Sequence, residues 1–301
     1  MQNLNLHKRT HMPEATDHLA FTASDRSRVS ILGETDRVEV IRFLSARPVH
    51  TVVMTSFIID NGLESQHNRG RFYGYRNSEG TLEGVALIGH STLVEARSNE
   101  ALKALALVAK SSETPIHLIM SSGTDAERFW NYFSDGLKQP RLACTELLFE
   151  VAFPFFVKNC KRDIRLATAD ELEQVAEAQA EVALIESGVC PFERDREGFL
   201  ARVLRRIEQG RVFVVVENGK LLFKADIIAE TPEVIYLEGV YVAPDYRGQG
   251  IGSSCLASLN MRLFERAQNI CLLSNVDHEG AHQSFRKAGF RQTDKCLTLF
   301  V

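Results

Sequence analysis

The sequence predicts an α/β (mixed α+β) protein of two modules, each a mixed, mostly antiparallel sheet flanked by helices. Three observations support this class. The length of 301 residues suits two domains of ordinary size. The second half of the chain alternates strand and helix patterns, and the first half repeats part of that order. The hydrophobic fraction of 45% and the charged fraction of 25% are typical of soluble globular proteins.

The second half has the clearer pattern, in the order β-α-α-β-β-β-α-β-α-β, which predicts a sheet with helices on its faces. Thr168 and Glu171 form a capping box that opens the first helix. Asn218-Gly219 predicts a hairpin turn. The expected strands are 164–168, 211–217, 220–229, 233–242, 270–275 and 293–300, and the expected helices are 169–185, 194–209, 250–268 and 279–288.

The first half repeats parts of this order at an offset of roughly half the chain, which indicates duplication of one module. The repeated elements are a hairpin at 71–90, a strand at 116–120, a helix at 125–133 and a strand at 144–151. We therefore expect a disordered N-terminus at 1–28, one domain at 29–152 and a second at 164–301. Pro154 and a basic run mark the linker near 153–165.

Charge and composition limit the partners. The net charge of −4 gives no reason to expect nucleic acid or a membrane surface as a partner. No apolar run reaches the roughly 18 residues needed to span a bilayer. His278 and His282 have metal-ligand spacing but no evident third ligand, so we expect no metal. We expect a reducing cytoplasmic location, because none of the cysteines forms a C-x-x-C pair: Cys144, Cys160, Cys190, Cys255, Cys271 and Cys296. We also expect a monomer or homodimer.

The most informative motif is VYVAPDYRGQGIGS at 240–253, where an apolar strand runs into a glycine-rich turn that opens a helix. Gly248, Gly250 and Gly252 allow the backbone to approach a ligand closely, since no Cβ intervenes. Free amides and the positive end of the helix dipole favour a phosphate group there. Arg247 can add a charge-assisted contact.

Other interpretations of this turn are weaker. The glycines could serve only the packing of a tight turn. A dinucleotide-binding turn fits poorly, because the third-glycine spacing is absent and the neighbouring strands form antiparallel hairpins. A P-loop is excluded, since no Gly-Lys-Ser/Thr follows.

Residues 164–301 resemble the GNAT family of N-acetyltransferases, whose Arg/Gln-x-x-Gly-x-Gly/Ala motif is matched by Arg247, Gly250 and Gly252. The first half resembles the degenerate domain of tandem-GNAT proteins. The resemblance implies acetyl-CoA as cosubstrate and acetyl transfer to a primary amine of a small molecule or peptide. It assigns these residues to the acetyl-CoA site: Val240, Tyr241, Val242, Arg247, Gly248, Gln249, Gly250, Ile251, Gly252, Ser253, Asn275 and Phe285.

Within that set the resemblance implies separate roles. Amides of 249–253 hold the pyrophosphate, the strand at 240–242 pairs with the pantetheine arm, and Asn275 lies where the sheet opens. The family often has a proton-donating Tyr in the pattern Ala-x-x-x-Tyr-x-x-x-Gly-Phe. Phe285 stands at that position here, and Ser284 or His278 are possible substitutes.

Glu238 is the candidate general base. Strand alternation is expected to place it on one face with Val240 and Val242, where apolar surroundings would raise the pKa of its carboxyl. A solvated or ion-paired Glu238 is an equally open interpretation. The leading hypothesis is an N-acetyltransferase, and the alternative is a non-catalytic acetyl-CoA-binding sensor or scaffold. The acceptor and the acyl length stay undefined.

Overall fold

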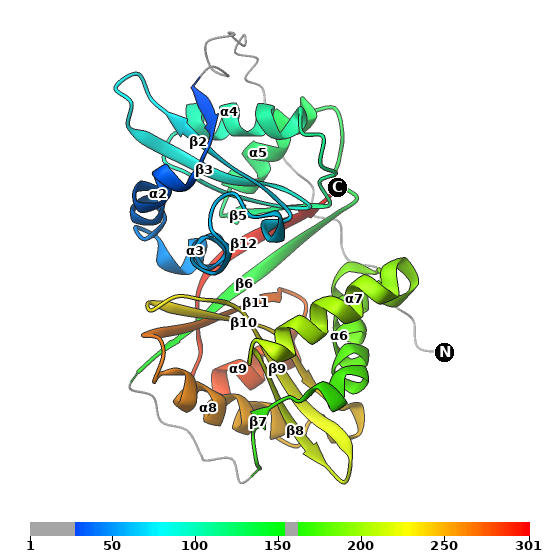
Figure 1. Cartoon of the computed structure of the whole chain (residues 1–301). Coiled ribbons are helices and arrows are strands. Elements are labelled where there is room, and N and C mark those ends of the chain that lie inside the picture. Colours follow the sequence, from blue (N-terminus) through cyan, green and yellow to red (C-terminus); the bar gives the residue numbers. More distant parts are fainter. Residues whose placement is uncertain (1–27, 154–161) are drawn as a thin grey trace. The chain divides into compact units, whose positions relative to one another are not determined.

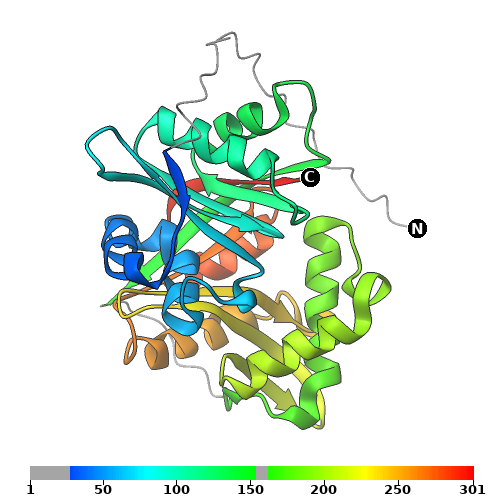
Figure 2. The same cartoon turned by 45° about the horizontal axis from the view of Figure 1, so that its top comes forward.

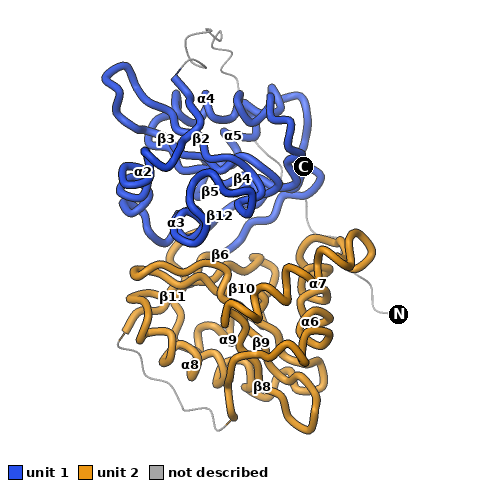
Figure 3. Tube along the Cα trace, in the orientation of Figure 1, with its two compact units in different colours: residues 1–146, 295–301 blue, residues 147–294 orange. Residues whose placement is uncertain are grey.

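The computed structural model describes residues 28–153 and 162–301 (Figure 1). These residues form two compact units (Figure 3). Among the described residues, unit 1 comprises 28–146 together with Lys295–Val301, and unit 2 comprises 147–153 and 162–294. The predicted disordered N-terminus at 1–28 lies outside the described residues except for its last residue. Most of the predicted linker at 153–165 lies outside them as well.

The predicted second domain, 164–301, differs from this division at the end of the chain. The last strand, β12 (Arg291–Phe300), pairs antiparallel with β5 (Leu118–Ser122), from Cys296 opposite Ser122 to Phe300 opposite Leu118. Residues Lys295–Val301 therefore complete the sheet of unit 1, although they come last in the sequence. Pairing between segments so distant in sequence left no local signal.

Unit 1 has the strand order β1-β2-β3-β4-β5-β12-β6. The pair β4–β5 is parallel, and the pairs β1–β2, β2–β3, β3–β4 and β5–β12 are antiparallel. Helices α4 and α5 pack in one core cluster and α2 and α3 in another. The remaining bounds are β1 Val29–Ile31, β2 Gly70–Arg76, β3 Leu82–Gly89, β4 Ser91–Ala96, β6 Leu142–Ala152, α2 Arg37–Leu44, α3 Pro48–Asn61, α4 Asn99–Lys110, α5 Asp125–Ser134, and the 3₁₀ turns η1 Glu34–Asp36 and η2 Gln66–Asn68.

The strands of unit 2 have the order β6-β11-β10-β9-β8-β7, with β10 and β11 parallel. The predicted capping box is confirmed, since the Thr168 amide donates to Glu171 Oε2 at 2.9 Å. The bounds are β7 Arg165–Leu166, β8 Val212–Glu217, β9 Lys220–Glu230, β10 Val234–Val242, β11 Asn269–Asn275, α6 Leu172–Ser187, α7 Pro191–Glu208, α8 Ile251–Leu263, α9 Glu279–Lys287, and the 3₁₀ turns η3 Ala169–Glu171 and η4 Pro244–Tyr246.

Alternation along the strands of unit 2 builds two core clusters on opposite faces of the sheet. Phe213 and Val215 of β8 pack with α8 and α9, whereas Val212 and Val214 pack with α6 and α7. The two helix pairs lie on opposite sides of the strands (Figure 1, Figure 2). The mixed sheet flanked by helices confirms the predicted fold class.

We expect Leu299→Ala to destabilise unit 1, because Leu299 is fully buried among residues of α4 and α5. Truncating a buried leucine costs about 2–5 kcal/mol of unfolding free energy. Urea unfolding would measure the loss, and hydrogen exchange would locate it in α4 and β5. The matched control is Gln292→Ala, an exposed position on the same strand. Equal stability of the two variants would contradict the assignment of this strand to the core of unit 1.

Candidate functional site

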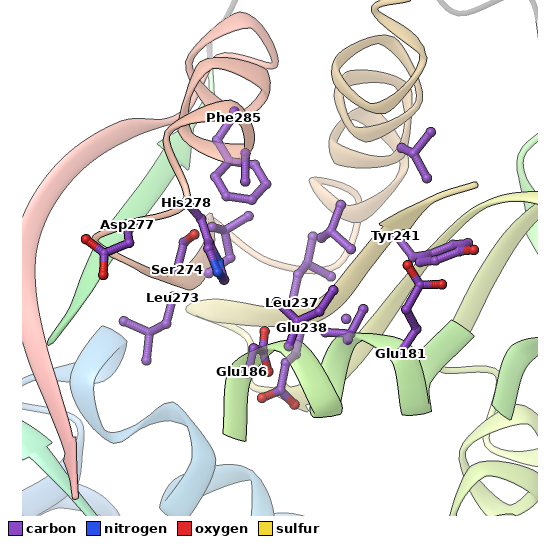
Figure 4. A pocket seen from close by; sticks show the side chains of 18 of the residues that line it. Glu181, Glu186, Leu237, Glu238, Tyr241, Leu273, Ser274, Asp277, His278 and Phe285 are labelled. Atoms are coloured by element: carbon purple, nitrogen blue, oxygen red, sulfur yellow. The ribbon is translucent and has the colours of Figure 1, made fainter. Parts of the chain in front are cut away.

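A cavity of about 460 Å³ lies in unit 2 beside strands β10 and β11 (Figure 4). Its wall is built by α6, β10, β11, Arg247, the loop that leads into α9 and α9 itself. The lining residues are Glu181, Val182, Ile185, Glu186, Leu237, Glu238, Gly239, Val240, Tyr241, Val242, Arg247, Leu272, Leu273, Ser274, Asp277, His278, Glu279, Gly280, Ala281 and Phe285.

The cavity exists because two parallel strands part. Pairing between β10 and β11 runs from Val234 opposite Asn269 to Leu237 opposite Leu272 and then ends. Beyond that point β10 keeps its pairing with β9 on the other side. The edge of β10 that faces β11 is thereby left open along the residues that line the cavity.

A β-bulge at Gly239 corrects the predicted orientation of Glu238. The register with β9 shifts between Glu238 and Tyr241, and Gly239 has a φ of 60°. One extra residue reverses the alternation that follows it. Val240 and Val242 pack against the α8–α9 cluster. Glu238 instead pairs in register with Asp226 on the face toward α6 and α7, so the expectation that the three side chains share a face is wrong.

Glycine suits the bulge. A Cβ on Gly239 would lie 2.4 Å from Gln179 Oε1 and 2.7 Å from Lys224 Nζ, and its positive φ disfavours other residues. The Lys224 ammonium, which is fully buried, donates to the Gly239 carbonyl at 3.1 Å. The kink in β10 is therefore fixed to α6 and β9 by hydrogen bonds.

Glu238 is half-buried and lines the cavity. Burial raises the pKa of its carboxyl above the usual range, Arg206 and Lys224 oppose this rise, and Asp226 reinforces it. Both cations bind Asp226, and neither forms an ion pair with Glu238 within the described residues. The carboxylate is therefore available to a group that enters the cavity.

The glycine-rich loop has the geometry of a helix start. Gly248 and Gly250 both have a φ of 77°, which explains glycine at these positions. A Cβ on Gly252 would lie 3.0 Å from Val242 Cγ2, so close packing explains glycine there. In the part of the chain that the structure describes, the main-chain amides of 248–253 meet no protein acceptor. Helix α8 begins at Ile251 and presents these amides at its positive end.

Arg247 ties this loop to α6. Its Nε donates to the Val242 carbonyl at 2.9 Å, and its Nη2 lies 2.8 Å from Glu181 Oε1. The same Glu181 approaches Tyr241, and burial together with this carboxylate raises the pKa of the phenol (Figure 4). Arg247 is therefore engaged within the protein.

The expected position of a proton-donating Tyr is occupied by a core residue. Phe285 is buried, lines the cavity and packs with its ring centroid 5.6 Å from that of Phe149. Of the two possible substitutes, the Ser284 hydroxyl donates to the Gly280 carbonyl and is not among the lining residues. His278 lines the cavity, and its ring is directed into it (Figure 4).

Residues 248–253, Asn275 and His282 are not among the residues that line the cavity. The Asn275 side chain accepts a hydrogen bond from the Asp277 amide at 2.9 Å and shapes the turn after β11. The buried His282 contacts the Asn275 carbonyl at 3.0 Å. Across 28–153 and 162–301, no group of three His, Cys, Asp or Glu side chains is placed to hold a metal ion.

Sequence reasoning missed the α6 part of the wall. Glu181, Ile185 and Glu186 reach the cavity only through the packing of α6 on the sheet, and the helix pattern alone does not show which side faces a ligand. The wall carries one guanidinium and a larger set of carboxylates: Glu181, Glu186, Glu238, Asp277 and Glu279. Among the described helices, none has the length and apolarity to cross a membrane.

Comparisons with known proteins agree with this geometry. Residues 208–292 match the family model of an acetyltransferase (GNAT) domain. No curated protein matches the chain. Among the solved structures that share its fold are three whose alignments cover 90–91% of this chain and 98% of the other chain. They are a Drosophila protein at 11% identity and a TM-score of 0.64, a GNAT-family acetyltransferase from Colwellia psychrerythraea at 14% and 0.55, and a tandem GNAT protein from the clavulanic acid biosynthesis pathway at 12% and 0.53.

The matched residues lie inside unit 2 and contain the bulged strand, the glycine-rich loop and most of the cavity wall. The solved structures extend the likeness of fold to unit 1. Residues 208–292 are thus similar to an acetyltransferase (GNAT) domain, and the chain as a whole shares the fold of a tandem GNAT protein.

Proposed function

We propose that the protein is an acetyl-CoA-dependent N-acetyltransferase that uses the cavity of unit 2 to acetylate a primary amine of a small molecule or peptide. The observation that carries this proposal is the parting of β10 and β11 after Leu237 and Leu272, next to a helix start with free amides. An extended ligand with a phosphate group at one end fits such a site.

The chain offers two kinds of contact to acetyl-CoA. The open edge of β10 at 240–242 can exchange main-chain hydrogen bonds with the amides of the pantetheine arm. The unpaired amides of 249–253 can receive the pyrophosphate, assisted by the dipole of α8. Arg247 then acts by holding the loop in place through Glu181 and Val242.

The charge of the cavity favours a cationic acceptor. Carboxylates outnumber cations in the wall, which attracts an ammonium group and disfavours anionic substrates. In the proposed reaction Glu238 takes a proton from the bound ammonium, directly or through water. The amine nitrogen then attacks the acetyl carbonyl carbon, the carbon–sulfur bond breaks, and the CoA thiolate receives a proton from His278.

A second function is favoured by one observation. Phe285 occupies the place of the family's usual proton donor and has no proton to give. The alternative is therefore a protein that binds acetyl-CoA without transferring the acetyl group. Release of CoA thiol in the presence of a panel of cationic, neutral and anionic amines separates the two functions. Binding without amine-dependent release would favour the sensor or scaffold.

We expect Gly250→Trp to weaken acetyl-CoA binding by about tenfold or more, because the indole would crowd the helix start and shift its amides. Isothermal titration calorimetry measures the affinity. The control is Gly219→Trp, which places the same side chain at a positive φ of 74° in open space in the β8–β9 hairpin. Equal affinities for both variants would refute the assignment of the loop to CoA.

Glu238→Gln should lower kcat by about 100-fold or more while changing acetyl-CoA affinity little, since it removes only the proton acceptor. Because the pKa of Glu238 is raised, the pH–rate profile of the wild type should also show an acid limb, that is, a fall of kcat at low pH. The base works when deprotonated, so the rate rises with pH through this pKa. The variant should lose that limb. A wild-type pH profile in the variant would exclude Glu238 as the base.

His278→Asn tests the proton donor. We expect a lower kcat with unchanged acetyl-CoA affinity, because the thiolate loses its proton source. Ser284→Ala serves as the control, since that hydroxyl is bonded to the Gly280 carbonyl. A larger loss in the serine variant than in the histidine variant would reverse the assignment.

A further inference from the structure

A lysine with no exposed surface lies directly behind the cavity wall. Lys224, on β9, has 0% of its side chain exposed. Its ammonium has three donors, and three acceptors surround it. Nζ lies 2.7 Å from Gln179 Oε1, 3.1 Å from the Gly239 carbonyl and 2.8 Å from Asp226 Oδ1. The ammonium thus donates hydrogen bonds to α6 and β10 and forms an ion pair with Asp226 of its own strand.

The interactions of Lys224 extend through Asp226 to α7, the second helix that packs on the α6–α7 face of the sheet. Asp226 is buried, and its other carboxylate oxygen lies 3.0 Å from Arg206 Nη1 on α7. Burying an ammonium costs free energy that an apolar side chain of similar size would not. Packing alone therefore does not explain a lysine at position 224, whereas a requirement to hold the Gly239 carbonyl does.

The Gly239 carbonyl that Lys224 holds belongs to the β-bulge of β10. Gly239 reverses the alternation of β10, so that Glu238 lies on the α6–α7 face and Val240 on the α8 face. Without the extra residue at the bulge, Glu238 and Val240 would point to the same side. The arrangement of the cavity wall therefore depends on keeping Gly239 in its bulged conformation.

We propose that Lys224 is a positioning residue for acetyl transfer, which holds the bulge at Gly239 and thereby keeps the Glu238 carboxylate in the cavity wall. This role rests on the proposed function, in which Glu238 is the base. Lys224 touches neither cosubstrate nor acceptor and acts through main-chain geometry and charge.

Because Lys224 carries a charge, its removal should change the pKa of Glu238 as well as the rate. Lys224 and Asp226 face Glu238 from β9 and Arg206 faces it from α7, while α6 contributes Glu181 and Glu186 to the same cavity. The segment after β11 adds Asp277, His278 and Glu279. Removing a cation from this group makes the ionised form of Glu238 less stable. The acid limb of the rate profile should therefore move to higher pH.

Lys224→Met tests the proposal, with the exposed Lys220→Met on the same strand as its control. We expect acetyl-CoA affinity within about threefold of wild type, a kcat at least about tenfold lower, and an acid limb displaced upward by about half a pH unit or more. The control should match wild type. A folded Lys224→Met with the kcat and pH profile of wild type would overturn the proposal.

Two further measurements cover the remaining outcomes. Gln179→Met removes one hydrogen-bond acceptor of Lys224 and leaves every charge in place. It should therefore lower kcat without moving the acid limb of the pH–rate profile. An unchanged kcat in this variant would contradict the positioning role even if Lys224→Met fails to fold. NMR titration of the Glu238 carboxyl, assigned with Glu238→Gln, needs no acceptor. A higher Glu238 pKa in Lys224→Met supports the proposal, and an equal pKa overturns it. Failure of the proposed function appears separately, as wild-type protein that does not bind acetyl-CoA.

Discussion

The main-chain kink at Gly239 is the constraint on which the site depends. It lies two residues after Leu237, the last residue of β10 that pairs with β11, and it turns Glu238 and the valines at 240 and 242 to opposite faces. A residue without a Cβ favours this kink, and Lys224 supplies a donor for its carbonyl. Parting of the strands opens the edge of β10, and the kink decides which side chains surround that edge. The open edge and the cavity therefore follow from the parting of the strands, and the placement of the candidate base follows from the kink.

Unit 1 has a parallel strand pair like that of unit 2, but side chains close the gap between its strands. Its parallel pair β4–β5 also stops early, but the Ser121 hydroxyl donates to the Val94 carbonyl across the gap at 3.0 Å. Arg47 joins Glu95 and Ser122 at the ends of the two strands. Helix α4 follows β4 as α8 follows β10, yet its start is capped by the Ser98 hydroxyl and has no glycine-rich loop. Side chains of unit 1 thus take the places that the proposal gives to a ligand in unit 2.

The sequence predicted what local signals control. The capping box at Thr168, the Asn218-Gly219 turn and the glycine-rich loop with the helix after it are all present in the structure, because short-range geometry specifies them. Two features escaped prediction because they depend on partners distant in sequence. The bulge needs the register of β9 and the contacts of Gly239, and the α6 part of the cavity wall needs tertiary packing. Helices α2 and α3 also went unassigned, although Pro48 at the start of α3 is a usual helix signal.

Amide hydrogen exchange of the wild-type protein with and without saturating acetyl-CoA tests the central claim most directly. The account predicts slower exchange in two segments, the open edge of β10 at 240–242 and the helix start at 248–253, with no such protection from NAD or ATP. Protection confined to other segments, or none in the presence of acetyl-CoA, would contradict the claim that the parted strands and the start of α8 form the cosubstrate site.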